Sequence, residues 1–203
     1  MNFQANNLDA AYNQVSALND LTTTTGVNIC DSLESNIKNL KVHWKGTDAT
    51  LHINNLISVL GGMRNIIVDV SKIAHNVSIP IVNVQTIRKS NGGTGGVGDV
   101  ISVYNGVFSN VTQVETTDEY YVDPSAAPTD LDTLVNICDR FDQFITQFQA
   151  TKQDLLNNWT SGSERATVVN NFETFEANVT SYKKDLTAAK DNLSIAVSNI
   201  LQA

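Results

Sequence analysis

Three histidines and two cysteines have the widest range of chemistry in this sequence, since such side chains ligate metals, move protons or act as nucleophiles. The histidines are His43, His52 and His75. The last two fall on one predicted helix but about six turns apart, which is too far for a shared metal ion. The motifs G-x-S-x-G, H-E-x-x-H and Cys-x-x-Cys do not occur. We therefore expect no enzymatic activity, no metal and no cofactor.

A glycine-rich stretch, N-G-G-T-G-G-V-G at 91–98, has the composition of a phosphate-binding loop. Such a loop runs from a strand into a helix, whose first N–H groups meet the phosphate, and it often carries a lysine. Here β-branched sequence follows the glycines, and no Lys-Ser/Thr pair follows them. We interpret the stretch as a flexible loop.

The two cysteines, Cys30 and Cys138, have two possible roles. They are too few for a disulfide-rich scaffold and lack metal-site spacing, so they fit two buried apolar side chains. In an antiparallel helical arrangement, however, helix geometry places them at similar heights. They are then a candidate thiol pair, and the spacing alone does not decide between the two roles.

Charge and composition exclude several classes of partner. The net charge is −8, from 13 Lys and Arg against 21 Asp and Glu. Nucleic acids and anionic membranes need a basic surface, so we expect neither as a partner. No apolar run reaches about 18 residues, which predicts no integral membrane segment. The first residues, M-N-F-Q-A-N-N-L, have neither a basic start nor an apolar core, so we expect no standard signal peptide.

An internal repeat sets the organisation of the chain. The pentapeptide V-N-I-C-D occurs at 27–31 and again at 135–139. A second pair of matched blocks, each with a tryptophan just before a glycine, follows in the same order. Two matched pairs indicate two copies of one unit, which we place at 1–77 and 131–203.

The tryptophan blocks predict the turns of two helical hairpins. Trp44 lies two residues before Gly46, and Trp159 lies three residues before Gly162. Residues on both sides recur in alternating steps of four and three and form largely apolar stripes, as in amphipathic helices. Around Trp159 these stripes are Leu134, Cys138, Phe141, Ile145, Phe148, Lys152 and Leu155 before it, and Val168, Phe172, Phe175, Val179, Tyr182, Leu186, Ala189, Leu193, Ala196 and Ile200 after it. Glycine can adopt positive φ at the turn, while tryptophan covers the open end of the hairpin and its indole N–H finds a polar partner. Packing alone would also explain these residues.

Two places along the predicted helices are irregular. T-T-T-T-G at 22–26 combines β-branched residues with glycine, which are poor helix formers, so we expect a kink or break there. Gly61-Gly62 lies inside the helix predicted for 53–77. It marks a kink, a close helix contact or a tolerated weak point.

The middle of the chain, 78–130, differs in character. Pro80 predicts the end of the preceding helix. β-branched stretches around Asn105-Gly106, a hairpin turn signal, predict a small β insertion, and P-S-A-A-P-T-D at 124–130 reads as a linker. A segment of this length can span a helical hairpin and place the two tryptophan turns at opposite ends.

These observations predict a mainly α fold in three parts. Residues 1–77 form the first helix-turn-helix hairpin, 78–130 the β-rich insertion and linker, and 131–203 the second hairpin. Pairing the two hairpins gives an antiparallel four-helix bundle within one chain. We therefore expect a monomer that contains an intramolecular pseudo-dimer.

The sequence W-K-G at 44–46, between two predicted helices, resembles the turn of the WXG-motif family, small helical hairpins exported by type VII secretion. W-T-S-G at 159–162 is similar but has one extra residue. Members of that family pair two hairpins into an antiparallel four-helix bundle. The resemblance therefore implies a fused pair, with a turn motif that contacts partners, formed by Trp44, Gly46, Trp159 and Gly162.

The resemblance also implies an export signal, which in this family is a tyrosine followed four residues later by an acid near the C-terminus. Here Asp185 follows Tyr182 by three residues. The pair is thus a possible degenerate form of that signal.

Residues and resemblance together predict a non-enzymatic bacterial protein that acts through protein–protein contacts, with the secretion machinery or a helical partner. It is expected to be secreted without a standard signal peptide, or cytoplasmic before export. The second hypothesis is a cytoplasmic helical adaptor or chaperone for a secreted partner.

Overall fold

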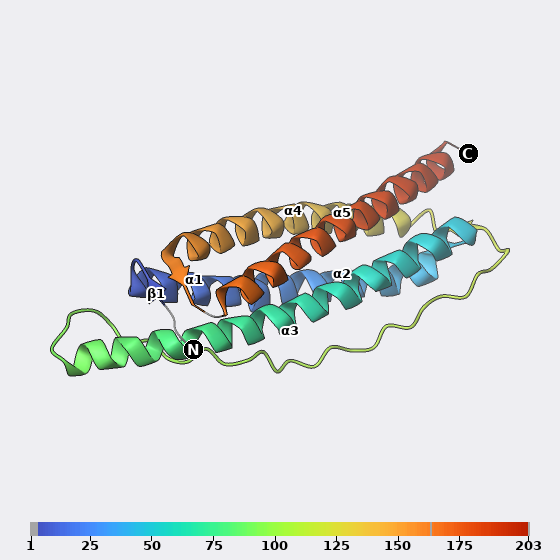
Figure 1. Cartoon of the computed structure of the whole chain (residues 1–203). Helices are drawn as coiled ribbons and strands as arrows, with labels where there is room; N and C mark the ends of the chain where they lie inside the picture. Colours follow the sequence, from blue (N-terminus) through green and yellow to red (C-terminus); the bar gives the residue numbers. More distant parts are fainter. Residues whose placement is uncertain (1–3, 163, 203) are drawn as a thin grey trace. The chain divides into compact units, whose positions relative to one another are not determined.

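The computed structural model describes residues 4–162 and 164–202 and is mainly α, with four packed helices and short two-stranded β pieces (Figure 1). The first long helix consists of α1, η1 and α2 in direct succession, and α3, α4 and α5 are the other three. The predicted mainly α fold is thus confirmed. The elements are β1 (Gln4–Ala5), α1 (Leu8–Asp20), η1 (Leu21–Gly26), α2 (Val27–His43), β2 (Trp44–Lys45), α3 (Thr47–Ser90), β3 (Tyr121–Val122), α4 (Ala127–Asn158), β4 (Trp159–Ser161) and α5 (Arg165–Leu201).

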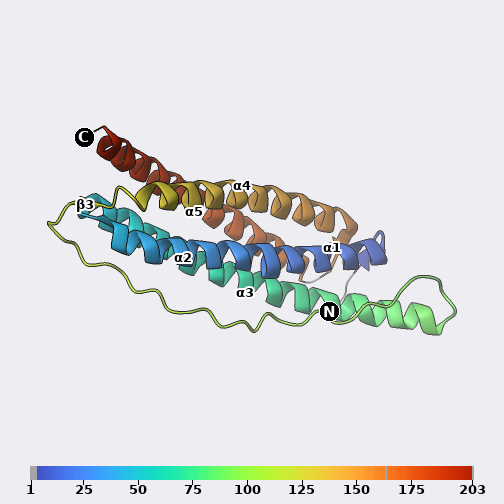
Figure 2. The same ribbon diagram turned by 180° about the vertical axis from the view of Figure 1, so that it is seen from behind.

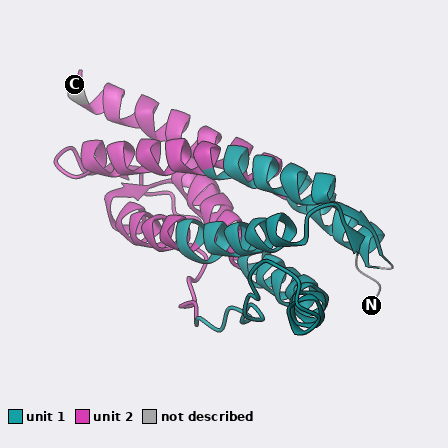
Figure 3. Cartoon of the chain, turned by 90° about the vertical axis from the view of Figure 1, so that its left-hand side faces the viewer, with its two compact units in different colours: residues 1–26, 65–106, 144–177 teal, residues 27–64, 107–143, 178–203 magenta. Residues whose placement is uncertain are grey.

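The chain forms two compact units (Figure 3). The first unit consists of residues 1–26, 65–106 and 144–177, and the second of residues 27–64, 107–143 and 178–203. Each unit contains a part of every long helix. Both predicted repeat copies therefore contribute to both units.

Aromatic side chains of α4 and α5 form much of the core in the first unit. The ring of Phe148 lies 6.1 Å from that of Phe144 and 5.8 Å, edge-on, from that of Phe172. Phe172 in turn lies 6.4 Å from Phe175. Apart from Phe144, these residues lie on the predicted apolar stripes, which confirms the helical phase. A β-carbon on Gly26 would lie 3.5 Å from Phe144 Cε2, so the first helix packs directly on this cluster.

The threonine run changes the geometry of the first helix without breaking it. η1 is a π-helical segment that joins α1 to α2. The hydroxyl of Thr22 donates to the carbonyls of Leu18 and Asn19 at 3.0 and 2.9 Å. Hydroxyl side chains that bond back to the preceding turn compete with the regular backbone ladder. The irregularity predicted at 22–26 is therefore a widened turn of helix.

The prediction that Pro80 ends its helix is wrong, because α3 continues to Ser90. A proline inside a helix costs about 3 kcal/mol through the lost hydrogen bond and a steric clash. Tertiary contacts in the first unit offset this cost. Pro80 and Ile81 are buried, and Arg88 Nη2 near the helix end donates to Asp9 Oδ1 of α1 at 2.8 Å.

Residues 91–120, here named the strap, contain neither helix nor strand (Figures 1 and 2). The small β content is confirmed, but its placement differs from the prediction. The stretch before the strap is helical, no hairpin forms at Asn105-Gly106, and β3 is the only strand between residues 78 and 130. β-branched residues favour any extended backbone, so composition did not distinguish a strap from a sheet.

The burial pattern of the strap explains its shape. From residue 98 to residue 117, half-buried residues recur at every third position, with one step of four, and the positions between them are exposed. A three-residue repeat is typical of a polyproline II backbone, whereas a strand alternates every two. The half-buried positions are Gly98, Ile101, Tyr104, Phe108, Val111, Val114 and Thr117.

Candidate functional site

The first tryptophan turn joins α2 to α3 in the second unit. Trp44 is only 3% exposed, and Gly46 has φ of +125°, a conformation that other residues rarely adopt. Trp44 and Lys45 form β2, which pairs antiparallel with β3. In this ladder Trp44 lies opposite Val122, and Lys45 lies opposite Tyr121.

The second tryptophan turn joins α4 to α5 in the first unit and has a similar arrangement, with an irregular strand register. Trp159 is 1% exposed, and Gly162 has φ of +144°. β4 pairs antiparallel with β1, with Gln4 opposite Ser161 and Ala5 opposite Trp159. The indole N–H of Trp159 donates to the Ser161 carbonyl at 2.9 Å, which confirms the expected polar partner.

Each turn is closed by the segment that precedes the first helix of the other hairpin. β3, which closes the first turn, leads into α4, and β1, which closes the second turn, leads into α1. At both turns, a further backbone hydrogen bond lies beside the strand pair. Asp123 N–H donates to the His43 carbonyl at 2.8 Å, and Asn6 N–H donates to the Asn158 carbonyl at 2.9 Å. We name this repeated arrangement the reciprocal cap.

The residue before each tryptophan adds a side-chain contact to the reciprocal cap. His43 Nδ1 lies 2.7 Å from Oδ2 of the buried Asp130, near the start of α4. Asn158 Nδ2 donates to Gln14 Oε1 of α1 at 3.2 Å. Sequence reasoning missed all of these cap residues. Strands of two or three residues have no periodicity to detect, and their partners lie far away along the chain.

A histidine lies behind the first turn. The rings of His52 and Trp44 are parallel within 6°, with centroids 5.9 Å apart. Burial lowers the pKa of His52, while Asp48 and Asp185 act against that shift. His52 Nδ1 is buried and has no hydrogen-bond partner among the described residues. The neutral imidazole therefore serves as a flat packing surface for the tryptophan.

The outer surface of the first turn is aromatic and charged. Tyr120 is 69% exposed and Tyr121 is 41% exposed. Lys45 Nζ lies 5.8 Å from the centre of the Tyr121 ring and 3.4 Å from Glu119 Oε2. Tyrosine beside a cation is typical of protein interfaces. Next to it lies a pocket of about 240 Å³, lined by Trp44, Lys45, Gly46, Thr47, Asp48, Ala49, Thr117, Asp118 and Tyr120.

The second turn differs from the first in how its helix end is closed. Arg165 Nε donates to the Trp159 carbonyl at 2.7 Å, and its Nη2 donates to the Leu156 carbonyl at 3.3 Å. A cation at these carbonyls suits the negative end of the α4 dipole. Beyond this turn, between α3 and α5, lies a pocket of about 340 Å³, lined by Ile73, Asn76, Val77, Glu164, Thr167, Val168 and Asn171.

Tyr182 and Asp185, the predicted export pair, are both half-buried in the second unit. Tyr182 is half-buried, and its hydroxyl lies where a β-carbon on Gly62 of α3 would be. Burial also raises the pKa of Tyr182. Asp185 is half-buried, near enough to His52 to influence its pKa. Neither side chain is fully displayed to solvent.

The two cysteines are free thiols in the second unit. Cys30 is fully buried, and desolvation raises its pKa to about 12. Cys138 is half-buried, and desolvation raises its pKa to about 11. Both thiols stay protonated at neutral pH and are poor nucleophiles, which favours the packing role over the thiol pair.

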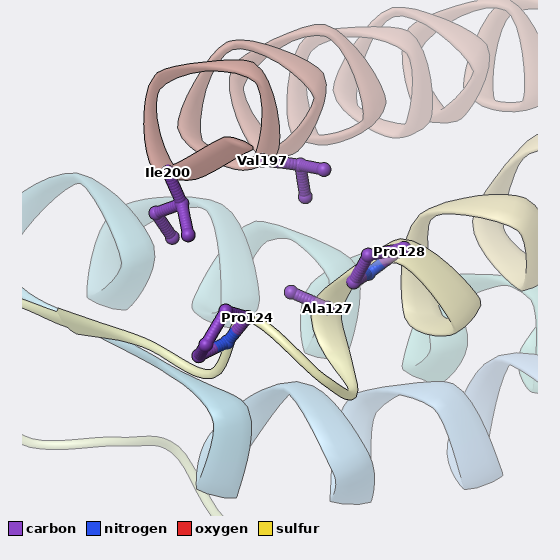
Figure 4. A pocket seen from close by; sticks show the side chains of 5 residues that line it. All are labelled: Pro124, Ala127, Pro128, Val197 and Ile200. Carbon is purple, nitrogen blue, oxygen red and sulfur yellow. The ribbon is translucent and has the colours of Figure 1, made fainter. Parts of the chain in front are cut away.

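The end of the C-terminal helix faces the start of α4. Figure 4 shows Val197 and Ile200 of α5 opposite Pro124, Ala127 and Pro128. These five apolar residues line a narrow gap in the second unit that is too small to hold a water molecule. The apolar stripe predicted for α5 is thus used for internal packing as far as its last turns.

Within the described ranges, no three metal-ligating side chains lie together. Over the same residues, no helix is both long and apolar enough to cross a membrane. Comparison with models of known protein families gives no match. Curated proteins and solved structures likewise show no significant similarity to the chain.

Proposed function

We propose that this chain is a fused pair of WXG-type helical hairpins, a non-enzymatic protein of type VII secretion that acts through protein–protein contacts. The reciprocal cap is the observation that carries the proposal. When two like surfaces pair about a two-fold axis, every contact that the first surface makes with the second is repeated from the second to the first. The two tryptophan turns repeat this relationship within a single chain.

Packing in both units supports an internally paired chain. In the first unit Gly26 packs on Phe144, and in the second Arg140 Nη1 donates to Ser32 Oγ at 3.0 Å. Each contact joins the first hairpin to the second. Burying a tryptophan is worth on the order of 4 kcal/mol as an upper bound. Both tryptophans are buried within the chain. The residues around them, and not the tryptophans themselves, are therefore the ones that can contact a partner.

The exposed rim of the first turn is the surface that we assign to a protein partner. It consists of Lys45, Tyr120 and Tyr121 beside the 240 Å³ pocket. Aromatic anchors next to a cation carry much of the binding energy in many interfaces. Recognition here needs no catalytic group, in keeping with a non-enzymatic role.

The inward position of Tyr182 and Asp185 favours the second candidate, a cytoplasmic adaptor or chaperone for a secreted partner. A receptor that reads a tyrosine and an acid from an extended or helical tail needs both side chains accessible. Here Tyr182 packs on Gly62 of α3. This chain would then accompany an exported protein while remaining in the cell.

Secretion by a type VII system provides the test. A tagged chain is expressed in a bacterium that has this system, with its secretion ATPase either intact or inactivated, and a cytoplasmic marker reports lysis. If the chain is an exported fused pair of WXG-type hairpins, it should appear in the culture medium only when the ATPase is intact. Retention in the cell in both strains, together with co-purification of an exported protein, supports the adaptor. Equal release from both strains would contradict both candidates.

A further inference from the structure

Strap residues 96–104 lie against α1 and α3 in the first unit, where side chains of these helices bond to the strap backbone. Two bonds meet Ile101, whose N–H donates to Ser78 Oγ at 3.0 Å and whose carbonyl lies 2.7 Å from His75 Nδ1. The others are Gly98 N–H to Gln85 Oε1 at 3.0 Å, Tyr104 N–H to Ser71 Oγ at 2.6 Å, Tyr12 hydroxyl to the Asp99 carbonyl at 2.8 Å, and Arg88 Nη2 to the Gly96 carbonyl at 3.0 Å.

The polar groups of α3 match the spacing of the strap. Ser71, Ser78 and Gln85 follow one another at intervals of seven residues, or about 10.5 Å of helix. Every third strap residue, spaced about 9.3 Å apart in a polyproline II backbone, donates its N–H to the next of these side chains. The two periods nearly coincide, so an extended chain stays in register with the helix.

These α3 side chains are buried polar groups that accept hydrogen bonds from the strap backbone. Ser71 and Ser78 are fully buried, and Gln85 is 2% exposed. Buried hydroxyl and amide groups without hydrogen bonds cost free energy. The strap backbone supplies a donor to each acceptor oxygen, while the Ser78 hydroxyl also donates to the His75 carbonyl and the Gln85 amide also donates to Asp9.

We name the face of α1 and α3 that holds strap residues 96–104 the groove, and this groove also selects side chains. A β-carbon on Gly98 would overlap the ring of Tyr12, so this position accepts only glycine without a rearrangement. Ile101 and Tyr104 are the next half-buried positions. The occupant therefore has the pattern G-x-x-Φ-x-x-Φ, where Φ is a large apolar or aromatic residue.

We propose that this groove is a binding site for an extended peptide with the pattern G-x-x-Φ-x-x-Φ. Strap residues 96–104 are its resident occupant, and a partner segment of the same pattern takes their place. The partner is thus an unfolded or extended stretch of another protein. This inference goes beyond the proposed secretion role and does not depend on it.

Several features make the resident segment exchangeable. Nearly all of the described polar contacts meet backbone atoms, which any extended peptide presents. Val97, Val100 and Val103 on the strap are exposed. The glycine-rich stretch at 91–98 lets the strap move away while α3 stays helical.

Binding of a labelled peptide that spans residues 95–106 tests the proposal, with the full chain and fluorescence anisotropy as the readout. In the chain, Gly98→Val expels the resident segment through the Tyr12 ring. It should raise peptide affinity at least about tenfold over the unmodified chain, because the site is then open in a larger fraction of molecules. Gly96→Ala is the matched control, since no atom lies within 4 Å of a β-carbon there, and it should leave affinity unchanged.

Two further measurements distinguish sequence-selective binding in the groove from non-specific binding to a disrupted chain. A peptide that itself carries Gly98→Val should fail to bind the opened chain. A second chain variant, Ile101→Gly with Tyr104→Gly, opens the groove without a steric clash and should bind the normal peptide like the first. The proposal is overturned if neither opened chain binds, if the valine peptide binds equally well, or if both opened chains lose helical circular dichroism.

Discussion

The hydroxyl of Tyr182 on α5 occupies the position that a β-carbon on Gly62 of α3 would take. In the second unit, α3 and α5 therefore meet at this point through a glycine. The neighbouring Gly61 has no atom within 4 Å of such a β-carbon. Of the alternatives that the Gly61-Gly62 sequence left open, a close helix contact holds for Gly62 alone.

The first prediction compares these two glycines. Gly62→Ala should destabilise the protein by about 1–3 kcal/mol, because the Tyr182 ring must move. Gly61→Ala should stabilise it by about 0.5–1 kcal/mol, because alanine favours the exposed helix. Urea unfolding measures both changes. Equal effects at the two positions would show that the close contact with Tyr182 does not exist.

The second prediction concerns a partly buried ionic cluster that bonds to the strap in the second unit. Glu34 accepts hydrogen bonds from Lys38 at 2.5 Å, from Ser109 of the strap at 2.6 Å, and from Arg64. The bonds from Lys38 and Ser109 are the main reason why the pKa of Glu34 falls from 4.5 to about 2. Arg64 also donates to the Ser109 carbonyl at 2.7 Å.

A carboxylate with a lowered folded-state pKa stabilises the fold above its unfolded pKa and loses that contribution as pH falls. The Glu34 contribution should therefore be complete above pH 4.5 and disappear toward pH 2. Glu34→Ala should cost about 1–3 kcal/mol at neutral pH, because the half-buried Arg64 loses its carboxylate partner. Unfolding measured across this pH range should show a flatter profile for the variant. An unchanged profile would contradict the cluster.

The third prediction concerns His52, whose pKa is lowered by burial against Trp44. Because the unfolded chain then binds the proton more readily, stability should fall as pH drops below 6.5. His52→Phe keeps a flat ring against Trp44 and removes this titration. The loss of stability between about pH 7.5 and 5.5 should be smaller in the variant than in the unmodified chain. An equal loss in both proteins would rule out a buried neutral histidine.

The fourth prediction tests the two turn glycines together. Gly46→Ala and Gly162→Ala should each cost about 1–2 kcal/mol, because both positions have positive φ. Gly96→Ala in the strap should change stability by less than about 0.5 kcal/mol, since its surroundings are open. Thermal or urea unfolding compares the three variants. A cost confined to one turn would show that the turns are not equivalent.

The helices could be predicted from the sequence because their apolar stripes are long and regular. On α5, every residue of the predicted stripe is buried apart from the half-buried Tyr182 and Ile200. Over many turns, burial of such a stripe outweighs local propensity. The same effect misled the prediction at Pro80, where tertiary packing holds the helix beyond the proline.

The candidate site could be predicted only in part. The positive φ of Gly46 and Gly162 followed from glycine beside a helix start. The strands that close the turns could not be foreseen, since they are two or three residues long and pair across the chain. The strap was misread because its three-residue repeat and its bonds to α3 side chains depend on the folded helix.

The central claim is that the two hairpins complete each other within one chain, and solution mass by light scattering tests it most directly. The reciprocal cap leaves both tryptophans buried without a second molecule, so the purified chain should have a mass of 22.1 kDa. That mass should not change with concentration. A stable particle of twice this mass, persisting on dilution, would contradict the account.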